Sequence, residues 1–288
     1  MDIPVFTVDA FTNLPFKGNP AAVCLLKNEL REEVYQKIAA EINLSETAFI
    51  TTIKPSEDFT NGSKFRLRWF TPTIEVNLCG HATLASAAVL FHQKKNVNSA
   101  VVFETKSGDL SVVQQGEDLV MDFPLNPPTK QDPDDFRHLI KVAVGDHPVE
   151  DVYLDSTTKK LLLRLADTCD RSVLTGLTVN PAALLSSDAS GRIKGLIVTM
   201  KGPSDSQPRY DFCSRYFSPW NGIPEDPVTG SAHTVLGSYW SKELGKKKML
   251  AFQCSSRGGE LGLEVKDNGR INIAGKGVTV LQGTITLK

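Results

Sequence analysis

Three side chains in this sequence could accept or donate a proton. Glu46 opens an otherwise apolar segment that is typical of a strand, and His81 begins a long run of small and apolar residues. Asp226 stands four residues before Gly230. Carboxyl and imidazole groups act as general acids and bases when they lie beside a substrate. Simpler interpretations stay open: a solvated strand end for Glu46, a core histidine for His81, and a turn residue before proline for Asp226.

Two short segments could bind an anion. Cys79-Gly80-His81 and Thr229-Gly230-Ser231 each precede a predicted helix. The first turn of a helix has free backbone N–H groups and a partial positive charge, and a glycine there lets a ligand approach the backbone. Together the two starts could hold a substrate carboxylate without Arg or Lys. Alternatively, the glycines only serve turns and Ser231 is an ordinary N-cap.

These groups predict an acid/base reaction. We expect burial to raise the pKa of Glu46 toward neutrality, because burial penalises its charged form. His81 stands where the helix dipole disfavours the imidazolium. The scattered positions of the other histidines predict no metal site, and the motifs of common cofactors and nucleophiles are missing.

An internal repeat indicates two similar halves. Arg68-Trp69-Phe70-Thr71-Pro72 returns as Arg215-Tyr216-Phe217-Ser218-Pro219, and Gly80-His81-Ala82 returns as Gly230-Ser231-Ala232. Gly108-Asp109-Leu110 then returns as Gly259-Glu260-Leu261, in the same order along the chain. Matches that keep their order are the signature of duplicated units.

Each half combines alternating segments with one apolar helix. The run from His81 to about Gln93 has no polar face, which predicts a helix buried on all sides. The run from Ser231 to about Leu244 is its equivalent, and Gly245 can end it. Short alternating segments predict strands, and a peripheral amphipathic helix is expected near residues 29–41. The pattern predicts an α+β protein of two similar domains, each a curved, mostly antiparallel sheet wrapped round a central helix.

The composition excludes several classes of protein. Hydrophobic residues make up 41% and charged residues 23% of the 288 residues, which is ordinary for a globular protein. With 32 basic and 33 acidic residues, the chain lacks the basic excess of a nucleic-acid-binding protein. No segment predicts a membrane span or a signal peptide. Five widely spaced cysteines favour free thiols, so we expect a cytoplasmic protein. The predicted carboxylate site leads us to expect a small-molecule ligand.

Several motifs together resemble one known family. Five segments are similar to segments of the PhzF-type, phenazine biosynthesis-like proteins: Gly18–Val23, Ser45–Phe49, Phe70–Pro72, Cys79–Thr83 and Glu225–Ala232. The resemblance covers essentially the whole chain. It implies the diaminopimelate epimerase-like fold, a homodimer, and a final strand that returns to the first domain. The implied domains are 1–124 plus about 278–288, and 125–277.

The resemblance also implies site residues. In bacterial members that act in phenazine synthesis, a glutamate at the position of Glu46 shuttles a proton while a dihydro-hydroxyanthranilate is isomerised. We therefore expect a cofactor-independent isomerase of a small carboxylic acid, with no metal. The implied catalytic residues are Glu46, His81 and Asp226, and the implied substrate-binding residues are Gly80, Gly230, Ser231, Asn19, Cys79 and Thr229.

Two other functions stay open. Related epimerases and racemases use two cysteines, one at each helix start, whereas this chain has Cys79 and Thr229. A threonine hydroxyl does not ionise near neutral pH, so an amino-acid or hydroxy-acid epimerase would need Glu46 or His81 to act with Cys79. The other alternative is a carboxylate-binding or scaffold protein without turnover.

Overall fold

The computed structural model describes residues 1–203 and 209–287 of the chain. Its contacts divide the chain into two compact units: unit 1 is Met1–Asp122 with Ala274–Lys288, and unit 2 is Phe123–Ile273. The chain leaves unit 1 within strand β8 (Asp118–Pro124) and returns within strand β16 (Arg270–Gly275). The domain boundaries expected from the sequence stay a prediction.

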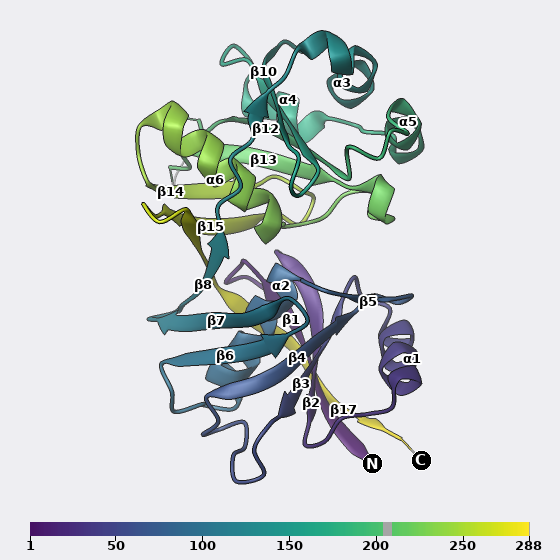
Figure 1. The fold of residues 1–288 in the computed structure, drawn as a ribbon, viewed down its shortest axis with the longest axis vertical. Helices are drawn as coiled ribbons and strands as arrows, with labels where there is room; N and C mark the ends of the chain where they lie inside the picture. The colour runs from purple at the N-terminus through teal and green to yellow at the C-terminus, as the bar shows by residue number, and fades with distance from the viewer. Residues whose placement is uncertain (204–208, 288) are drawn as a thin grey trace. The chain divides into compact units, whose positions relative to one another are not determined.

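Unit 1 is a mixed sheet around a central helix (Figure 1). Its strands pair in the order β17, β1, β2, β3, β4, β6, β7 and β8, and only the β2–β3 and β4–β6 pairs are parallel. A two-residue strand, β5, pairs with β4. The elements besides β8 are β1 (Asp2–Ala10), β2 (Asn19–Leu26), α1 (Glu32–Ile42), β3 (Thr47–Thr52), β4 (Lys64–Phe70), β5 (Glu75–Val76), α2 (Gly80–Ala88), the π-helical turn η1 (Val89–Gln93), β6 (Ala100–Thr105), β7 (Gly108–Gln115) and β17 (Gly277–Thr286).

Unit 2 repeats the same pairing pattern. The pairs β10–β11, β12–β13 and β14–β15 are antiparallel, while β11–β12 and β13–β14 are parallel. The series β1–β2, β2–β3, β3–β4, β4–β6 and β6–β7 alternates identically, which agrees with the sequence repeat. The elements besides β16 are β9 (Thr129–Lys130), the 3-10 turn η2 (Pro133–Phe136), α3 (Arg137–Val144), β10 (Val149–Asp155), β11 (Lys160–Leu165), α4 (Arg171–Gly176), α5 (Pro181–Ser187), β12 (Gly195–Lys201), β13 (Phe212–Phe217), the 3-10 turn η3 (Pro219–Asn221), α6 (Gly230–Leu244), β14 (Lys248–Gln253) and β15 (Gly259–Val265).

The two predicted central helices are buried. Every residue of α2 after Gly80 is buried, and its alanines let strands β1, β2, β3 and β17 approach closely. In α6, only Ser231 and the residues after Trp240 escape burial. Gly245 ends α6 with a φ of 63°, as its type predicts. The predicted α+β fold of two sheet-wrapped helices is confirmed.

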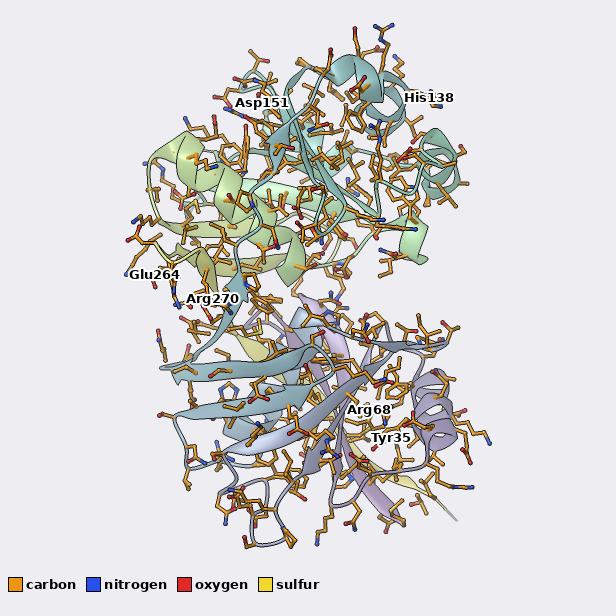
Figure 2. All side chains as sticks on the ribbon, in the orientation of Figure 1. Tyr35, Arg68, His138, Asp151, Glu264 and Arg270 are labelled. Carbon is orange, nitrogen blue, oxygen red and sulfur yellow. The ribbon has the colours of Figure 1, made fainter. Side chains whose placement is uncertain are left out.

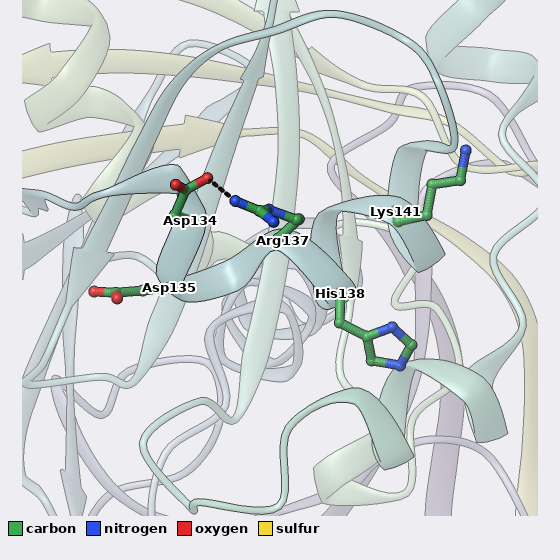
Figure 3. A pocket seen from close by; sticks show the side chains of 5 residues that line it. All are labelled: Asp134, Asp135, Arg137, His138 and Lys141. Atoms are coloured by element: carbon green, nitrogen blue, oxygen red, sulfur yellow. Dashed lines mark ion pairs between the residues drawn. The ribbon is translucent and has the colours of Figure 1, made fainter.

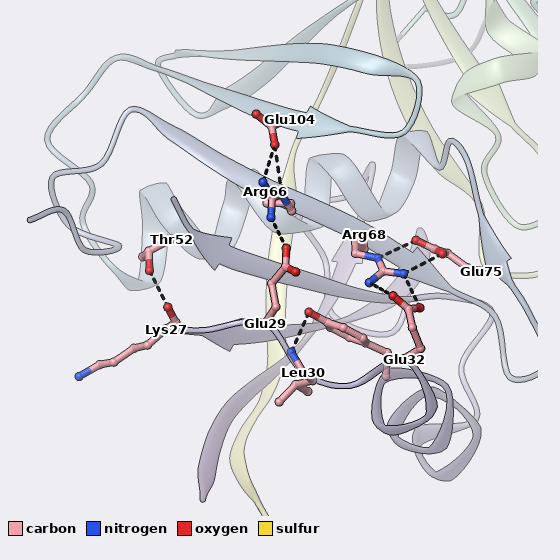
Figure 4. A network of polar contacts seen from close by, with 10 residues as sticks. Lys27, Glu29, Leu30, Glu32, Thr52, Arg66, Arg68, Glu75 and Glu104 are labelled. Carbon is pink, nitrogen blue, oxygen red and sulfur yellow. Dashed lines mark hydrogen bonds and ion pairs between the residues drawn. The ribbon is translucent and has the colours of Figure 1, made fainter. Parts of the chain in front are cut away.

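The peripheral helix α1 is tied to strand β4 by two polar contacts (Figure 4). Arg68 of β4 donates from Nη1 and from Nη2 to the Glu32 carboxylate of α1, each at 2.8 Å, and its Nε donates separately to Glu75 of strand β5 at 2.7 Å. Its guanidinium also stacks 4.7 Å from the centre of the Tyr35 ring (Figure 2). Beneath these contacts Tyr35 and Ile38 enter the core, which is the amphipathic pattern predicted for this helix.

Candidate active site

Glu46 is placed by the junction between strands β2 and β3. It immediately precedes β3, and its carbonyl oxygen accepts a 3.1 Å hydrogen bond from the backbone N–H of Ala22. This bond continues the parallel β2–β3 pairing, in which Ala22 lies opposite Thr47. The Glu46 residue is only 8% exposed. A carboxyl group at the end of a buried strand is therefore held inside unit 1 instead of in solvent.

Cys79 and His81 meet Glu46 at the start of helix α2. The Cys79 sulfur lies 3.4 Å from His81 Nδ1, and His81 Nε2 lies 3.2 Å from Glu46 Oε2. The imidazole therefore stands between a thiol and a carboxyl group, and all three residues are buried. The sequence placed Cys79 and His81 together because they are neighbours. Their contact with Glu46 depends on the tertiary fold.

The ionisation of Glu46 differs from our expectation. Burial raises its pKa, but the charge of His81, with hydrogen bonds from His81 and Ser45, outweighs burial and leaves the pKa below its usual value. The expected rise toward neutrality is therefore wrong. Burial lowers the pKa of His81, but the acidic groups of Cys79 and Glu46 raise it well above its usual value, despite the helix dipole. The pair is a carboxylate and an imidazolium near neutral pH.

Cys79 stays a neutral thiol in this arrangement. Burial, followed by the charge of Glu46, raises its pKa, and the opposing effects of His81 and of the Ala82 backbone are smaller. A buried thiolate beside a carboxylate would place two negative charges around one imidazolium. The resting charges of the cluster therefore sum to about zero, with one negative carboxylate and one positive imidazole.

Unit 2 carries the second predicted helix start. The Thr229 hydroxyl donates to Asp226 Oδ2, and the Asp226 backbone N–H donates to the Tyr216 carbonyl at 3.0 Å. Gly230 is buried, while Asp226 and Ser231 are partly exposed. Thr229 makes no side-chain cap at the start of α6, and Cys79 makes none at α2. The two equivalent helix starts therefore share an extended N-cap residue without a side-chain cap.

Gln253 was missed by the sequence analysis. Its Oε1 accepts from the Thr229 backbone N–H at 2.9 Å, and its Nε2 donates to the Asp226 carbonyl at 2.7 Å. Gln253 has no exposed surface, and Met249, Ala251 and Gln253 alternate on the buried face of β14. That alternation, with a polar residue at an inward position, is the signal that could have found it.

Two residues of the second helical turns anchor the two starts. The Thr83 hydroxyl donates to the Cys79 carbonyl at 2.6 Å, and His233 Nδ1 lies 2.7 Å from the Thr229 carbonyl. Because a carbonyl only accepts, His233 donates from Nδ1. Burial lowers the pKa of His233 to about 4, so it is neutral near pH 7. His233 therefore has a structural role at a position equivalent to Thr83.

Asn19 begins strand β2 and is completely buried.

A separate surface hollow lies on unit 2 beside helix α3 (Figure 3). Its side chains are exposed, and one ion pair of 2.9 Å joins Asp134 to Arg137. None of the predicted site residues lines this hollow, which is formed by Asp134, Asp135, Arg137, His138 and Lys141.

The buried cluster of unit 1 also has the composition of a metal site. One ligand atom each from Glu46, Cys79 and His81 lies within 4.8 Å of the others. Thiolate, imidazole and carboxylate are all ligands of Zn²⁺. No metal site was predicted because the other histidines are scattered along the chain, and the proximity of Glu46 to Cys79 and His81 depends on the tertiary fold.

Comparison with known proteins agrees with these features. The model of the PhzC-PhzF family, described as phenazine biosynthesis-like protein, matches residues 8–283. A Bos taurus phenazine biosynthesis-like domain-containing protein is 56% identical, with 99% of this chain and 100% of the relative covered. A Pseudomonas aeruginosa protein named an uncharacterized isomerase is 40% identical, with both chains fully covered. A crystal structure of an Enterococcus faecalis PhzF-family protein has a TM-score of 0.87 at 39% identity, with both chains fully covered.

The fold extends to more distant enzymes. A probable proline racemase from Agrobacterium radiobacter has a TM-score of 0.56 at 10% identity over 99% of this chain and 93% of its own, a likeness of fold alone. Two sheet-wrapped helices of this kind, with relatives named as isomerases, define an isomerase of the PhzF type. The chain belongs to the PhzC-PhzF family. Within the described residues, no helix combines the length and apolar character needed to cross a membrane.

Proposed function

We propose that this isomerase moves a proton between two carbon atoms of a small carboxylic acid, with Glu46 as the acid and base. The observation that carries the proposal is the buried ion pair between Glu46 Oε2 and His81 Nε2, 3.2 Å apart. A carboxylate beside an imidazolium is ionised and ready to accept a proton from carbon. Acid/base groups of this kind need no cofactor, which supports a cofactor-independent reaction.

The charges support a specific proton movement. When Glu46 accepts a proton from a substrate carbon, the carbon skeleton gains the electron pair and a negative charge. His81 is then released from its neutralised partner and its positive charge can stabilise the substrate anion. Glu46 returns the proton to a second carbon, which restores the ion pair. Asp226 is proposed to position the substrate or to share the proton.

The substrate carboxylate is proposed to be bound by the start of helix α2, beside Glu46, and a part for the start of helix α6 stays a prediction from the sequence. Both helices begin with a glycine and have no side-chain cap, so backbone N–H groups and the helix dipoles can serve an anion. Gly80 would supply these contacts, with Asn19 and Cys79 in the same unit, while the binding roles of Gly230, Ser231 and Thr229 stay predictions. The homodimer implied by the resemblance and the cytoplasmic location expected from the free cysteines both stay predictions, and light scattering would test the homodimer.

Exchange of hydrogen with solvent tests the proposal. The protein is incubated in D₂O with a panel of cyclic and unsaturated carboxylic acids, and deuterium on carbon is read by mass spectrometry. We expect incorporation with at least one acid, and a loss of at least about 100-fold in Glu46→Gln. Glu57→Gln, on the surface of the same unit, is the matched control. Exchange that survives Glu46→Gln would contradict the role of Glu46.

An epimerase that uses Cys79 is the second candidate. It is favoured by the 3.4 Å distance between the Cys79 sulfur and His81 Nδ1, because the neighbouring imidazolium would stabilise the thiolate that forms when Cys79 gives its proton to a substrate carbon. Cys79→Ser separates the two reactions. A large loss of exchange with inversion of the substrate favours the epimerase, and nearly normal exchange favours Glu46. Ligand-dependent thermal stabilisation without any turnover would favour a binding protein.

A further inference from the structure

Lys160 is a buried lysine of unit 2 without a counter-ion. It begins strand β11, and the residue is only 6% exposed. Within the described residues, its Nζ makes no hydrogen bond and no ion pair within 4.0 Å. Lysine is almost never buried to this degree unless its charge is paired. The acid/base chemistry of unit 1 makes no use of this amine.

The nearest carboxylate is held by other donors. Asp155 lies opposite Lys160 in the antiparallel β10–β11 pair. Its carboxylate accepts from the backbone N–H of Thr157 at 3.2 Å and of Thr158 at 2.9 Å, and also from the Thr158 hydroxyl. These three donors fix the Asp155 carboxylate in the hairpin turn of residues 156–159, so it does not form an ion pair with Lys160.

The groups on the other side of Lys160 are neutral. Lys160 pairs with Gly195 of the parallel strand β12, and side chains of paired residues project to the same side of a sheet. On that side, the Tyr216 hydroxyl lies 2.1 Å from the position that a Cβ of Gly195 would take. Burial raises the pKa of Tyr216 to about 12, so this hydroxyl is neutral near pH 7. Asp155 is therefore the charge that acts on the Lys160 amine.

These surroundings favour the neutral amine. Burial lowers the pKa of Lys160 to about 8, and the charge of Asp155 offsets the effect of burial only in part. Near pH 7.5, about a quarter of the chains then carry a neutral amine at this position, against about 0.1% for an ordinary lysine. The neutral amine is the nucleophilic form of lysine. Nζ is not one of the fully enclosed polar atoms that lack a partner among the described residues, so it keeps contact with solvent.

We propose that Lys160 is a modification site that takes an acyl group from an activated acyl compound, either a thioester or an acyl phosphate. The Nζ lone pair attacks the acyl carbon and a C–N bond forms. The C–S or C–O bond then breaks, thiolate or phosphate leaves with the electron pair, and the amine proton goes to solvent. The amide product has no charge for burial to oppose, whereas a carbamate formed with CO₂ would place a second negative charge near Asp155. This inference does not rest on the function proposed for Glu46.

Acetylation of the folded wild-type protein tests the site. The protein is incubated with acetyl phosphate or with acetyl-coenzyme A from about pH 6 to about pH 10, and fragment mass spectra separate Lys160 from its neighbour Lys159. Lys159 is the matched control, because it is exposed and its Nζ donates to the Gly191 carbonyl at 3.1 Å. We expect Lys160 to react at least about 10-fold faster than Lys159 at pH 7.5. Its rate should level off above about pH 8, whereas the rate of Lys159 should rise to about pH 10.

Unfolding and substitution show whether the difference comes from the fold. In urea both amines are solvated, so the two lysines should react at equal rates. Lys159→Arg should keep the fast site and Lys160→Met should remove it, while the comparison within the wild type does not depend on any variant folding. Acetylation by either donor supports the site and identifies the donor class. Equal rates in the folded protein, a Lys160 rate that still rises above about pH 9, or no acetylation of Lys160 by either donor would overturn the proposal.

Discussion

Breaking the ion pair between Glu46 and His81 should destabilise unit 1 far more than breaking a surface pair. The two groups are 3.2 Å apart, which corresponds to an attraction of about 5 kcal/mol at an effective dielectric constant of about 20. Removing one partner leaves the other charge buried, at a typical cost of about 3–5 kcal/mol. We therefore expect His81→Gln to lower the free energy of unfolding by about 3 kcal/mol. Part of this loss is recovered when Glu46 takes up a proton and becomes neutral.

A double-mutant cycle isolates this interaction. Glu46→Gln, His81→Gln and the double variant are compared with the wild type at pH 6, where both groups are charged. Hydrogen exchange of peptides from β2 and β3 gives the free energy of opening of unit 1. We expect a coupling energy of at least about 1.5 kcal/mol, as found for close charge pairs.

The exposed pair Lys54–Glu57, at 2.8 Å in the same unit, is the control. Its coupling should stay below about 1 kcal/mol, because solvent screens it. If the buried pair couples no more strongly than this control, or if the two single costs simply add, the assigned charges are wrong.

Three further predictions concern pH and packing. Because the fold lowers the pKa of Glu46, its carboxylate adds stability above the ordinary carboxyl pKa of about 4.3. This stability is lost as pH falls through the folded-state pKa. Urea unfolding should therefore show the wild type losing more stability than Glu46→Gln as pH decreases from 5. Gln253→Ala leaves buried polar groups without partners at the start of α6, so we expect a loss of about 2–4 kcal/mol in urea and faster amide exchange there; unchanged exchange would contradict this role. Gly18→Ala places a Cβ 2.1 Å from the Ala10 carbonyl oxygen at a φ of +64°, whereas a Cβ at Gly108 meets nothing within 4 Å. In thermal unfolding, Gly18→Ala should therefore lose at least about 2 kcal/mol more stability than Gly108→Ala. Equal losses would show that the close approach relaxes.

Much of the fold could be predicted because the decisive signals are local or repeated. The run after His81 contains almost no polar residue, and only a fully enclosed helix suits such a run. The repeat of Arg68-Trp69-Phe70 as Arg215-Tyr216-Phe217 places both segments on equivalent strands, β4 and β13. The change from α-helix to a π-helical turn at Val89 was not predicted, because periodicity does not distinguish them.

The site was predictable only where its residues are neighbours in sequence. Cys79, Gly80 and His81 form one helix start, so their proximity follows from the chain itself. The direction of the Glu46 pKa does not, because it depends on a contact with His81, 35 positions along the chain. Burial and an opposite charge shift a carboxyl pKa in opposite directions, and only the 3.2 Å distance decides between them. Gln253 was missed for the same reason, since its partners lie on another element.

A crystal structure with a bound carboxylic acid, chosen from those that show deuterium exchange, tests the central claim most directly. We predict that the acid's carboxylate accepts hydrogen bonds from backbone N–H groups at the start of α2, and that the exchanging carbon lies about 3.5 Å or less from a Glu46 oxygen. A carboxylate bound elsewhere, or an exchanging carbon beyond the reach of Glu46, would contradict the account.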